Sequence, residues 1–128
     1  MKPVVLVTGG SRGIGAATAW LAAQQGWAVA VNYTQDAAAS KGAIESFTIG
    51  LARELAADGI RVNAVRPGVV DTEIHASRPP GQLAEIIRSV PLGRIGTPDD
   101  IARSIVFLAC EEESSFVTGA LLDARGGR

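Results

Sequence analysis

The sequence predicts an α/β fold built on a small, doubly wound parallel sheet. Three observations lead to this prediction. Short apolar, β-branched runs alternate with longer segments that have helical periodicity. These runs lack the polar alternation of a sheet with one wet face, which is typical of parallel strands buried on both sides. Finally, the first helical segment follows the first apolar run through a glycine-rich turn.

The elements follow from these patterns and from the residues that end them. Gly26 and Gly59 stand where glycine commonly ends a helix. Thr97 to Asp100 read as a helix start, with a capping Thr, a proline in the first turn and two acids at the positive end of the helix dipole. We expect helices at residues 13–25, 39–57, 82–88 and 97–110, and strands at residues 3–7, 28–32, 60–65 and 120–124.

The order of these strands in the sheet can also be predicted. A right-handed crossover through the helix at 39–57 could carry the chain from the second strand across the first. Residues 60–65 would then pair in parallel with residues 3–7, and the four strands would lie in the order 2-1-3-4. The alternative leaves an open slot between the first two strands and the last two, which exposes two apolar strand edges.

Length and composition limit the class of protein. The 128 residues suit a single domain, 1–128, made of an N-terminal βαβ unit (1–36) and a C-terminal segment (39–128). A formal net charge of −1 argues against a nucleic-acid partner. Cys110 is the only cysteine, so we expect neither a disulfide framework nor a metal site, and a reducing compartment fits. No run is long enough for a membrane span or a signal peptide, so we expect a cytoplasmic protein.

The turn from Thr8 to Gly15 has the composition of a phosphate cradle. It places Gly9, Gly13 and Gly15 between an expected strand and an expected helix. A pyrophosphate needs close access to main-chain amides, and the helix N-terminus adds unpaired N–H groups and positive partial charge. The alternative is a glycine-rich turn that binds nothing.

Several motifs together resemble the classical short-chain dehydrogenase/reductase family, in its branch of sugar dehydrogenases and oxoacyl reductases. They are the T-G-x-x-x-G-x-G turn, the N-x-x-x-P-G segment at residues 63–68 with Thr72 beyond it, the loop at 91–98, and the final segment at 117–127. The resemblance implies a Rossmann-like fold, an oxidoreductase that moves hydride between a nicotinamide dinucleotide and a small alcohol or carbonyl substrate, and a homo-oligomer. It also implies these cofactor-binding residues: Thr8, Gly9, Ser11, Arg12, Gly13, Ile14, Gly15, Tyr33, Lys41, Pro67, Gly68 and Thr72.

The catalytic residues of that family are largely missing from this chain. Ser40 to Ala43 resemble the end of the family's Tyr-x-x-x-Lys segment, with Lys41 as its lysine, but Ala37 stands in the tyrosine position. The catalytic serine and the Asn-Asn-Ala-Gly segment have no counterpart, so the resemblance implies a large internal deletion between about Asp36 and Ser40. Without the tyrosine that transfers the proton, Lys41 could only hold a cofactor ribose, and we expect little or no turnover.

The choice of cofactor and the function of the whole chain remain open. Arg12 could meet a 2′-phosphate, and the second strand ends in Val31-Asn32-Tyr33 without the acid that would bind a ribose 2′-hydroxyl, which favours NADP over NAD. One alternative is a non-catalytic nucleotide-binding or subunit-interaction module. Another is a sequence that joins two pieces of a longer enzyme.

Overall fold

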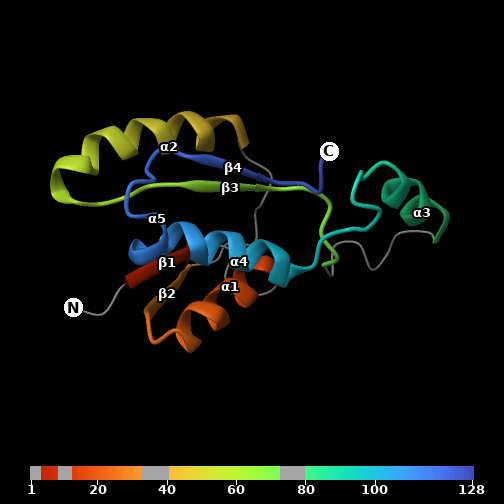
Figure 1. Cartoon of the computed structure of the whole chain (residues 1–128), viewed down its shortest axis with the longest axis horizontal. Helices are drawn as coiled ribbons and strands as arrows, with labels where there is room; N and C mark the ends of the chain where they lie inside the picture. Colours follow the sequence, from red (N-terminus) through yellow and green to blue (C-terminus); the bar gives the residue numbers. More distant parts are fainter. Residues whose placement is uncertain (1–3, 9–12, 33–40, 73–79) are drawn as a thin grey trace.

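The computed structural model describes residues 4–8, 13–32, 41–72 and 80–128 (Figure 1). Strands and helices alternate through the first half of the chain, as an α/β fold requires, and the α/β prediction is confirmed. In chain order the elements are β1 (Val4–Thr8), α1 (Gly13–Gln24), β2 (Ala28–Asn32), α2 (Lys41–Leu55), the 3-10 turn η1 (Ala56–Asp58), β3 (Ala64–Pro67), α3 (Pro80–Arg88), α4 (Pro98–Ala109), α5 (Glu111–Ser114) and β4 (Leu121–Ala124).

The predicted strand order 2-1-3-4 is wrong. The described strands form two separate parallel pairs, β1 with β2 and β3 with β4, and β1 does not pair with β3. The free edge of β3 offers a physical reason. Ala64 and Gly68 donate their N–H groups toward β4, so the alternate residues Val65 and Pro67 face the other edge, where proline has no N–H to donate.

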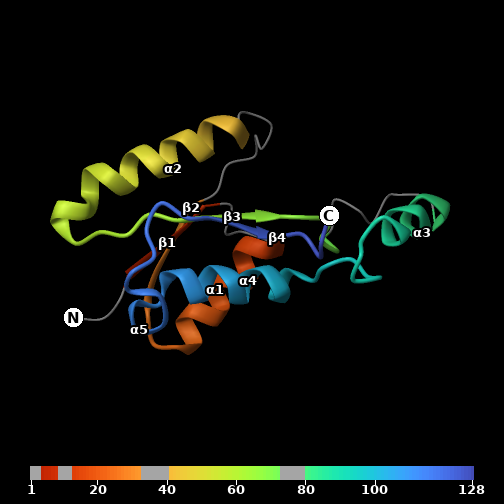
Figure 2. The same cartoon turned by 45° about the horizontal axis from the view of Figure 1, so that its top comes forward.

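Helices lie on both sides of the strands (Figures 1 and 2). α2 lies on one side of the β3–β4 pair, while α1 and α4 lie together on the other side. The most extensive packing between any two described elements is that of α1 against α4. This helix contact connects the β1–β2 half of the fold to the β3–β4 half, although the two pairs of strands do not hydrogen-bond to each other. Among the described residues the buried apolar side chains are Val7, Ala22, Ala52, Val70, Val90, Ile101, Ala102, Val106 and Leu108.

β3 begins later than the sequence predicted, at Ala64 rather than residue 60. The residues before it are held by side chains instead of a strand ladder: Asn63 donates to the carbonyl of Val117 at 2.9 Å and accepts from the N–H of Ala120 at 3.0 Å. The guanidinium of Arg61 donates to the carbonyls of Leu108 and Ala109 at 2.6 and 3.0 Å, where it satisfies the C-terminal end of α4. Residues 61–63 therefore join α4 to the chain that leads into β4.

The helix ends agree with the sequence prediction. Gly26 and Gly59 have φ angles of 81° and 71°, the left-handed conformation in which glycine carries no steric cost. Thr97 caps α4, and its hydroxyl accepts from the N–H of Asp100 at 3.1 Å. No helix within the described ranges has the length and apolar character that a membrane span would require.

Candidate functional site: the start of helix α1

The candidate site begins where β1 gives way to α1. β1 ends at Thr8, and α1 opens at Gly13 with a φ angle of 57°, a conformation that glycine adopts freely. Ile14 and Gly15 form the rest of the first turn, whose N–H groups have no partner within the helix. Unpaired N–H groups at the start of a helix favour an anion as ligand.

A second predicted motif lies directly against this turn. A Cβ atom placed on Gly13 would be 3.5 Å from Cγ2 of Thr72 and 3.9 Å from its Cβ. Gly13 follows the carboxyl end of β1, and Thr72 follows the carboxyl end of β3. In open α/β sheets, ligands bind outside the carboxyl ends of the strands. The fold thus brings together two segments that are far apart in the sequence, at the edge where a dinucleotide would be expected.

The position of Thr72 depends on the loop before α4. The N–H of Asp71 donates to the carbonyl of Gly96 at 2.8 Å, and the N–H of Gly96 donates to the carbonyl of Val69 at 2.9 Å. Val70 and Gly96 form an isolated parallel bridge through these bonds. The segment that carries Thr72 is therefore fastened to residue 96 on both sides of Val70.

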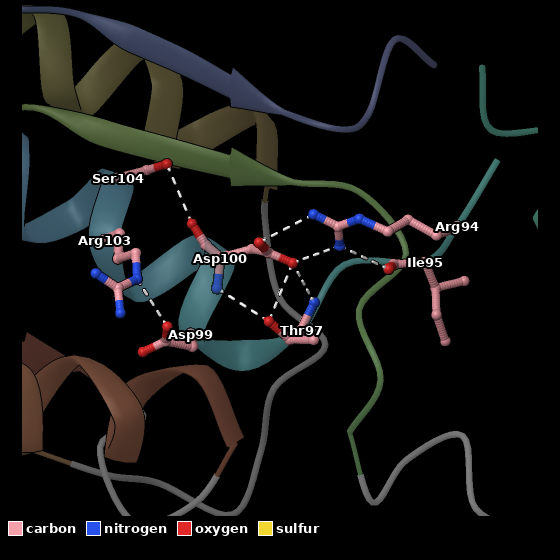
Figure 3. A network of polar contacts seen from close by, with 7 residues as sticks. All are labelled: Arg94, Ile95, Thr97, Asp99, Asp100, Arg103 and Ser104. Carbon is pink, nitrogen blue, oxygen red and sulfur yellow. Dashed lines mark hydrogen bonds and ion pairs between the residues drawn. The ribbon is translucent and has the colours of Figure 1, made fainter. Parts of the chain in front are cut away.

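A compact polar network holds that loop in turn (Figure 3). The guanidinium of Arg94 donates to both carboxylate oxygens of Asp100, at 2.6 and 3.1 Å. The same carboxylate accepts from the backbone N–H of Thr97 at 2.8 Å, which completes a capping box at the start of α4. Because Arg94 and Thr97 flank Gly96, Asp100 fixes both ends of the short loop on which Val69 and Asp71 depend.

Charge in this network is stabilised by its partners. Two hydrogen bonds hold the pKa of Asp100 well below its usual range. The larger effect comes from the bond that Arg94 donates, and the next largest from the bond that the backbone N–H of Thr97 donates. The side chains of Arg94 and Asp100 are 57% and 39% exposed, so solvent screens part of this attraction. The sequence predicts the helix start at residues 97–100 but not its link to Thr72, because that link depends on contacts between distant backbone segments.

Gly68 has a packing role beside its predicted cofactor role. A Cβ atom on Gly68 would lie 2.8 Å from the Cα of Arg125, too close for any side chain. The preceding Pro67 ends β3. The structure therefore explains glycine at this position by the approach of the C-terminal segment, and it places Pro67 and Gly68 in the chain that leads to Thr72.

The remaining predicted residues divide into two groups. Lys41 is the first residue of α2, although its side chain lies outside the description. The backbone of Thr8 is described as the last residue of β1. The predicted positions Gly9, Ser11, Arg12, Tyr33 and Ala37 lie outside the described residues.

Two other kinds of site can be compared with this one. A cavity of about 210 Å³ lies beside the network and is lined in part by Val69, Arg94, Asp100 and Arg125. It is smaller than the usual pocket for a drug-sized ligand, and neither Gly13 nor Thr72 lines it. Within the described part of the chain, no group of three or more His, Cys, Asp or Glu residues is arranged to hold a metal ion.

The alternation of strands and helices places this chain among α/β proteins, and comparisons with known proteins agree. Residues 34–128 match the family model described as enoyl-(acyl carrier protein) reductase. The uncharacterized oxidoreductase YgfF of Escherichia coli (strain K12) is 47% identical over 94 residues, which are 73% of this chain and 38% of that protein. Acetoacetyl-CoA reductase of Shinella zoogloeoides is 44% identical over 106 residues, 82% of this chain and 42% of that protein.

A solved structure gives the same result for the fold. A short chain dehydrogenase family protein of Francisella tularensis subsp. tularensis SCHU S4 aligns with a TM-score of 0.78 and 20% identity, over 99% of this chain and 98% of that chain. The chain belongs to the short-chain dehydrogenase/reductase family. It spans about two fifths of the length of the two sequence relatives named above.

The Asp100 network leads to a prediction about acid stability. Because the pKa of Asp100 is depressed in the folded chain, its carboxylate stabilises the fold above the unfolded pKa of about 4, and this contribution is lost as pH falls toward the folded pKa. The substitution Asp100→Asn should lower the free energy of unfolding at pH 7 by about 1 kcal/mol, through loss of the cap. It should also flatten the decline in stability below pH of about 4.

Urea unfolding of both proteins between pH 7 and pH 2.5 measures this effect. Asp99→Asn is the control, because it removes a carboxylate from the same helix turn that contacts only Arg103 among the ion pairs described. Equal acid slopes for the unaltered chain and Asp100→Asn would contradict the prediction.

Proposed function

We propose that this chain binds a nicotinamide dinucleotide at the start of α1, with its pyrophosphate at the first turn and its nicotinamide end near Thr72. The observation that carries the proposal is the contact between Gly13 and Thr72 at the carboxyl ends of β1 and β3. Membership of the family supports the choice of cofactor, because the family implies NAD or NADP. Arg12 and the lack of an acid at the end of the second strand, residues 31–33, favour NADP.

The described residues fit such a ligand. A side chain on Gly13 would lie against Thr72 and would crowd the first-turn amides to which the pyrophosphate is proposed to bind. The bound nicotinamide would supply the hydride chemistry, whereas the chain's own residues would bind and orient it. The hydroxyl of Thr72 offers a donor and an acceptor for a carboxamide. Lys41, at the start of α2, is proposed to hold a ribose hydroxyl.

The chain is proposed to bind the cofactor without turning over substrate. Ala37 occupies the position of the family's proton-donating tyrosine, and the family's serine has no counterpart. A methyl side chain cannot transfer a proton to a carbonyl oxygen, so hydride transfer would leave an alkoxide without a partner. Relatives with different substrates in their names match similarly well, so they do not identify an alcohol or carbonyl for this chain.

The exposed surface favours self-association as a second property. The accessible surface is 8795 Å², more than a third above the roughly 6,400 Å² expected of a compact monomer of this mass. The exposed apolar side chains include Trp20, Phe47 and Phe116. A net charge of −1 gives little repulsion between copies.

We expect sedimentation equilibrium to give a mass of at least two chains, and a monomer at micromolar concentration would refute this.

The first test of the proposed function is a substitution at Gly13. Gly13→Val should abolish NADPH binding in a calorimetric titration, because a branched side chain blocks the approach of the pyrophosphate to the first-turn amides. Gly50→Ala is the matched control, since a Cβ atom there meets no atom within 4 Å. Circular dichroism should show that both variants keep their helices. Unchanged affinity in a folded Gly13→Val variant would contradict the proposal.

The second test concerns turnover. With NADPH and either acetoacetyl-CoA or a sugar lactone, the unaltered chain should give no more oxidation of cofactor than Lys41→Ala. Ala37→Tyr should not restore turnover, because the serine that orients the carbonyl is still missing. Steady cofactor oxidation above the Lys41→Ala background, followed at 340 nm, would show that the chain is an active enzyme.

A further inference from the structure

A single arginine joins three elements of the fold. Arg66 of β3 forms a bidentate pair with Asp123 of β4: Nε donates to Oδ1 at 2.8 Å and Nη2 to Oδ2 at 2.7 Å. The remaining nitrogen, Nη1, donates to Oε1 of Glu45 in α2 at 2.9 Å. The guanidinium fork is fully suited to this use, because it can contact two carboxylates at once in a fixed plane. Arg66 therefore connects α2 to the β3–β4 pair.

The two carboxylate contacts of Arg66 differ in how much they add to the connection between the elements that they join. β3 and β4 are already joined by backbone hydrogen bonds at both ends of the pair, so the contact with Asp123 reinforces an existing link. α2 comes close to the chain before β4 at Gly119, where the side chain of Ala52 lies 3.5 Å from the position of a Cβ on Gly119. Small, smooth contacts do little to stop a helix from sliding along its axis. The bond to Glu45 opposes such sliding because it has a direction and a short length.

The bond between Arg66 and Glu45 lies close to Lys41 in the sequence of α2. Glu45 comes four residues after Lys41, so the two residues lie on the same face of the helix, one turn apart. We propose that Glu45 and Arg66 are positioning residues that set where the first turn of α2, and with it Lys41, stands beside the dinucleotide. This inference rests on the proposed function, in which Lys41 holds a ribose hydroxyl.

A purely stabilising surface ion pair is the competing explanation. The side chains of Arg66 and Glu45 are 33% and 38% exposed, and pairs in such surroundings add little to the free energy of folding. The pair between Arg103 and Asp99 is slightly shorter, at 2.7 Å, and more exposed, and it lies within α4 and joins no two elements. A positioning role therefore predicts that Glu45 affects ligand binding through Lys41, whereas a stabilising role predicts only a small loss of stability for either pair and no specific effect on binding.

A double-mutant cycle on the full chain distinguishes these explanations. NADPH affinity is measured by fluorescence titration for the unaltered chain, Glu45→Gln, Lys41→Met and the double variant, with Asp99→Asn as control. Glu45→Gln should weaken binding by about three- to tenfold, which is the range for one modest interaction. In the Lys41→Met background the same change should have no further effect, because the group that it positions is gone. Arg66→Lys should give an intermediate loss, since lysine keeps the charge without the fork.

The possible results of this experiment separate the positioning role of Glu45 from the proposed binding of the dinucleotide. Equal losses from Glu45→Gln in both backgrounds, no loss from it at all, or no loss from Lys41→Met would overturn the positioning role. A loss for Asp99→Asn as large as that for Glu45→Gln would also overturn it. Unfolding midpoints of all variants identify any loss that comes from partial unfolding. Failure of the unaltered chain to bind NADPH would instead overturn the proposed function, a result distinct from additive losses in a chain that binds.

Discussion

The packing of α1 against α4 is the constraint on which the rest of the described structure depends. Parallel strands normally gain their stability as members of a wider sheet covered by helices. Here the strands form two pairs that do not hydrogen-bond to each other. The contact between the two helices therefore carries much of the connection between the N-terminal βαβ unit and the C-terminal segment. It also brings the start of α1 close to the loops around the start of α4.

The candidate site is a product of this arrangement rather than of either half alone. The glycine turn belongs to the first pair of strands, and Thr72 belongs to the second. Thr72 is placed by backbone bonds to Gly96, and Gly96 lies between the two residues that Asp100 holds. A capping interaction at the start of α4, which would be expected to affect only that helix, thus reaches the proposed binding surface. Such a chain of short contacts is how a fold with a small core can still fix the geometry of a site.

Arg66 likewise connects several elements through a few short contacts. Its guanidinium meets one carboxylate from β4 and one from α2. The hydrogen bonds that Arg66 donates to Asp123, and then to Glu45, raise the pKa of its guanidinium, so it stays charged throughout the range in which proteins fold. The two described faces of the strands are therefore organised differently. α1 and α4 pack on one face, while α2 lies on the other, where Ala52 comes close to Gly119 and Glu45 pairs with Arg66.

The sequence by itself determined the local structure and the family. Glycines at helix ends, the Thr97 cap and the strand at 28–32 were all predicted, because each depends on residues close together in the chain. Tertiary structure alone decided which strands pair, that β3 starts only at Ala64, and that Gly13 meets Thr72. The reason is physical: which strands pair depends on the free-energy differences between many alternative pairings of segments far apart in the sequence. The sequence of one short strand, such as Ala64–Pro67, is compatible with several of these partners. Pro67 did carry one part of that information, since a strand residue without an N–H suits a free edge.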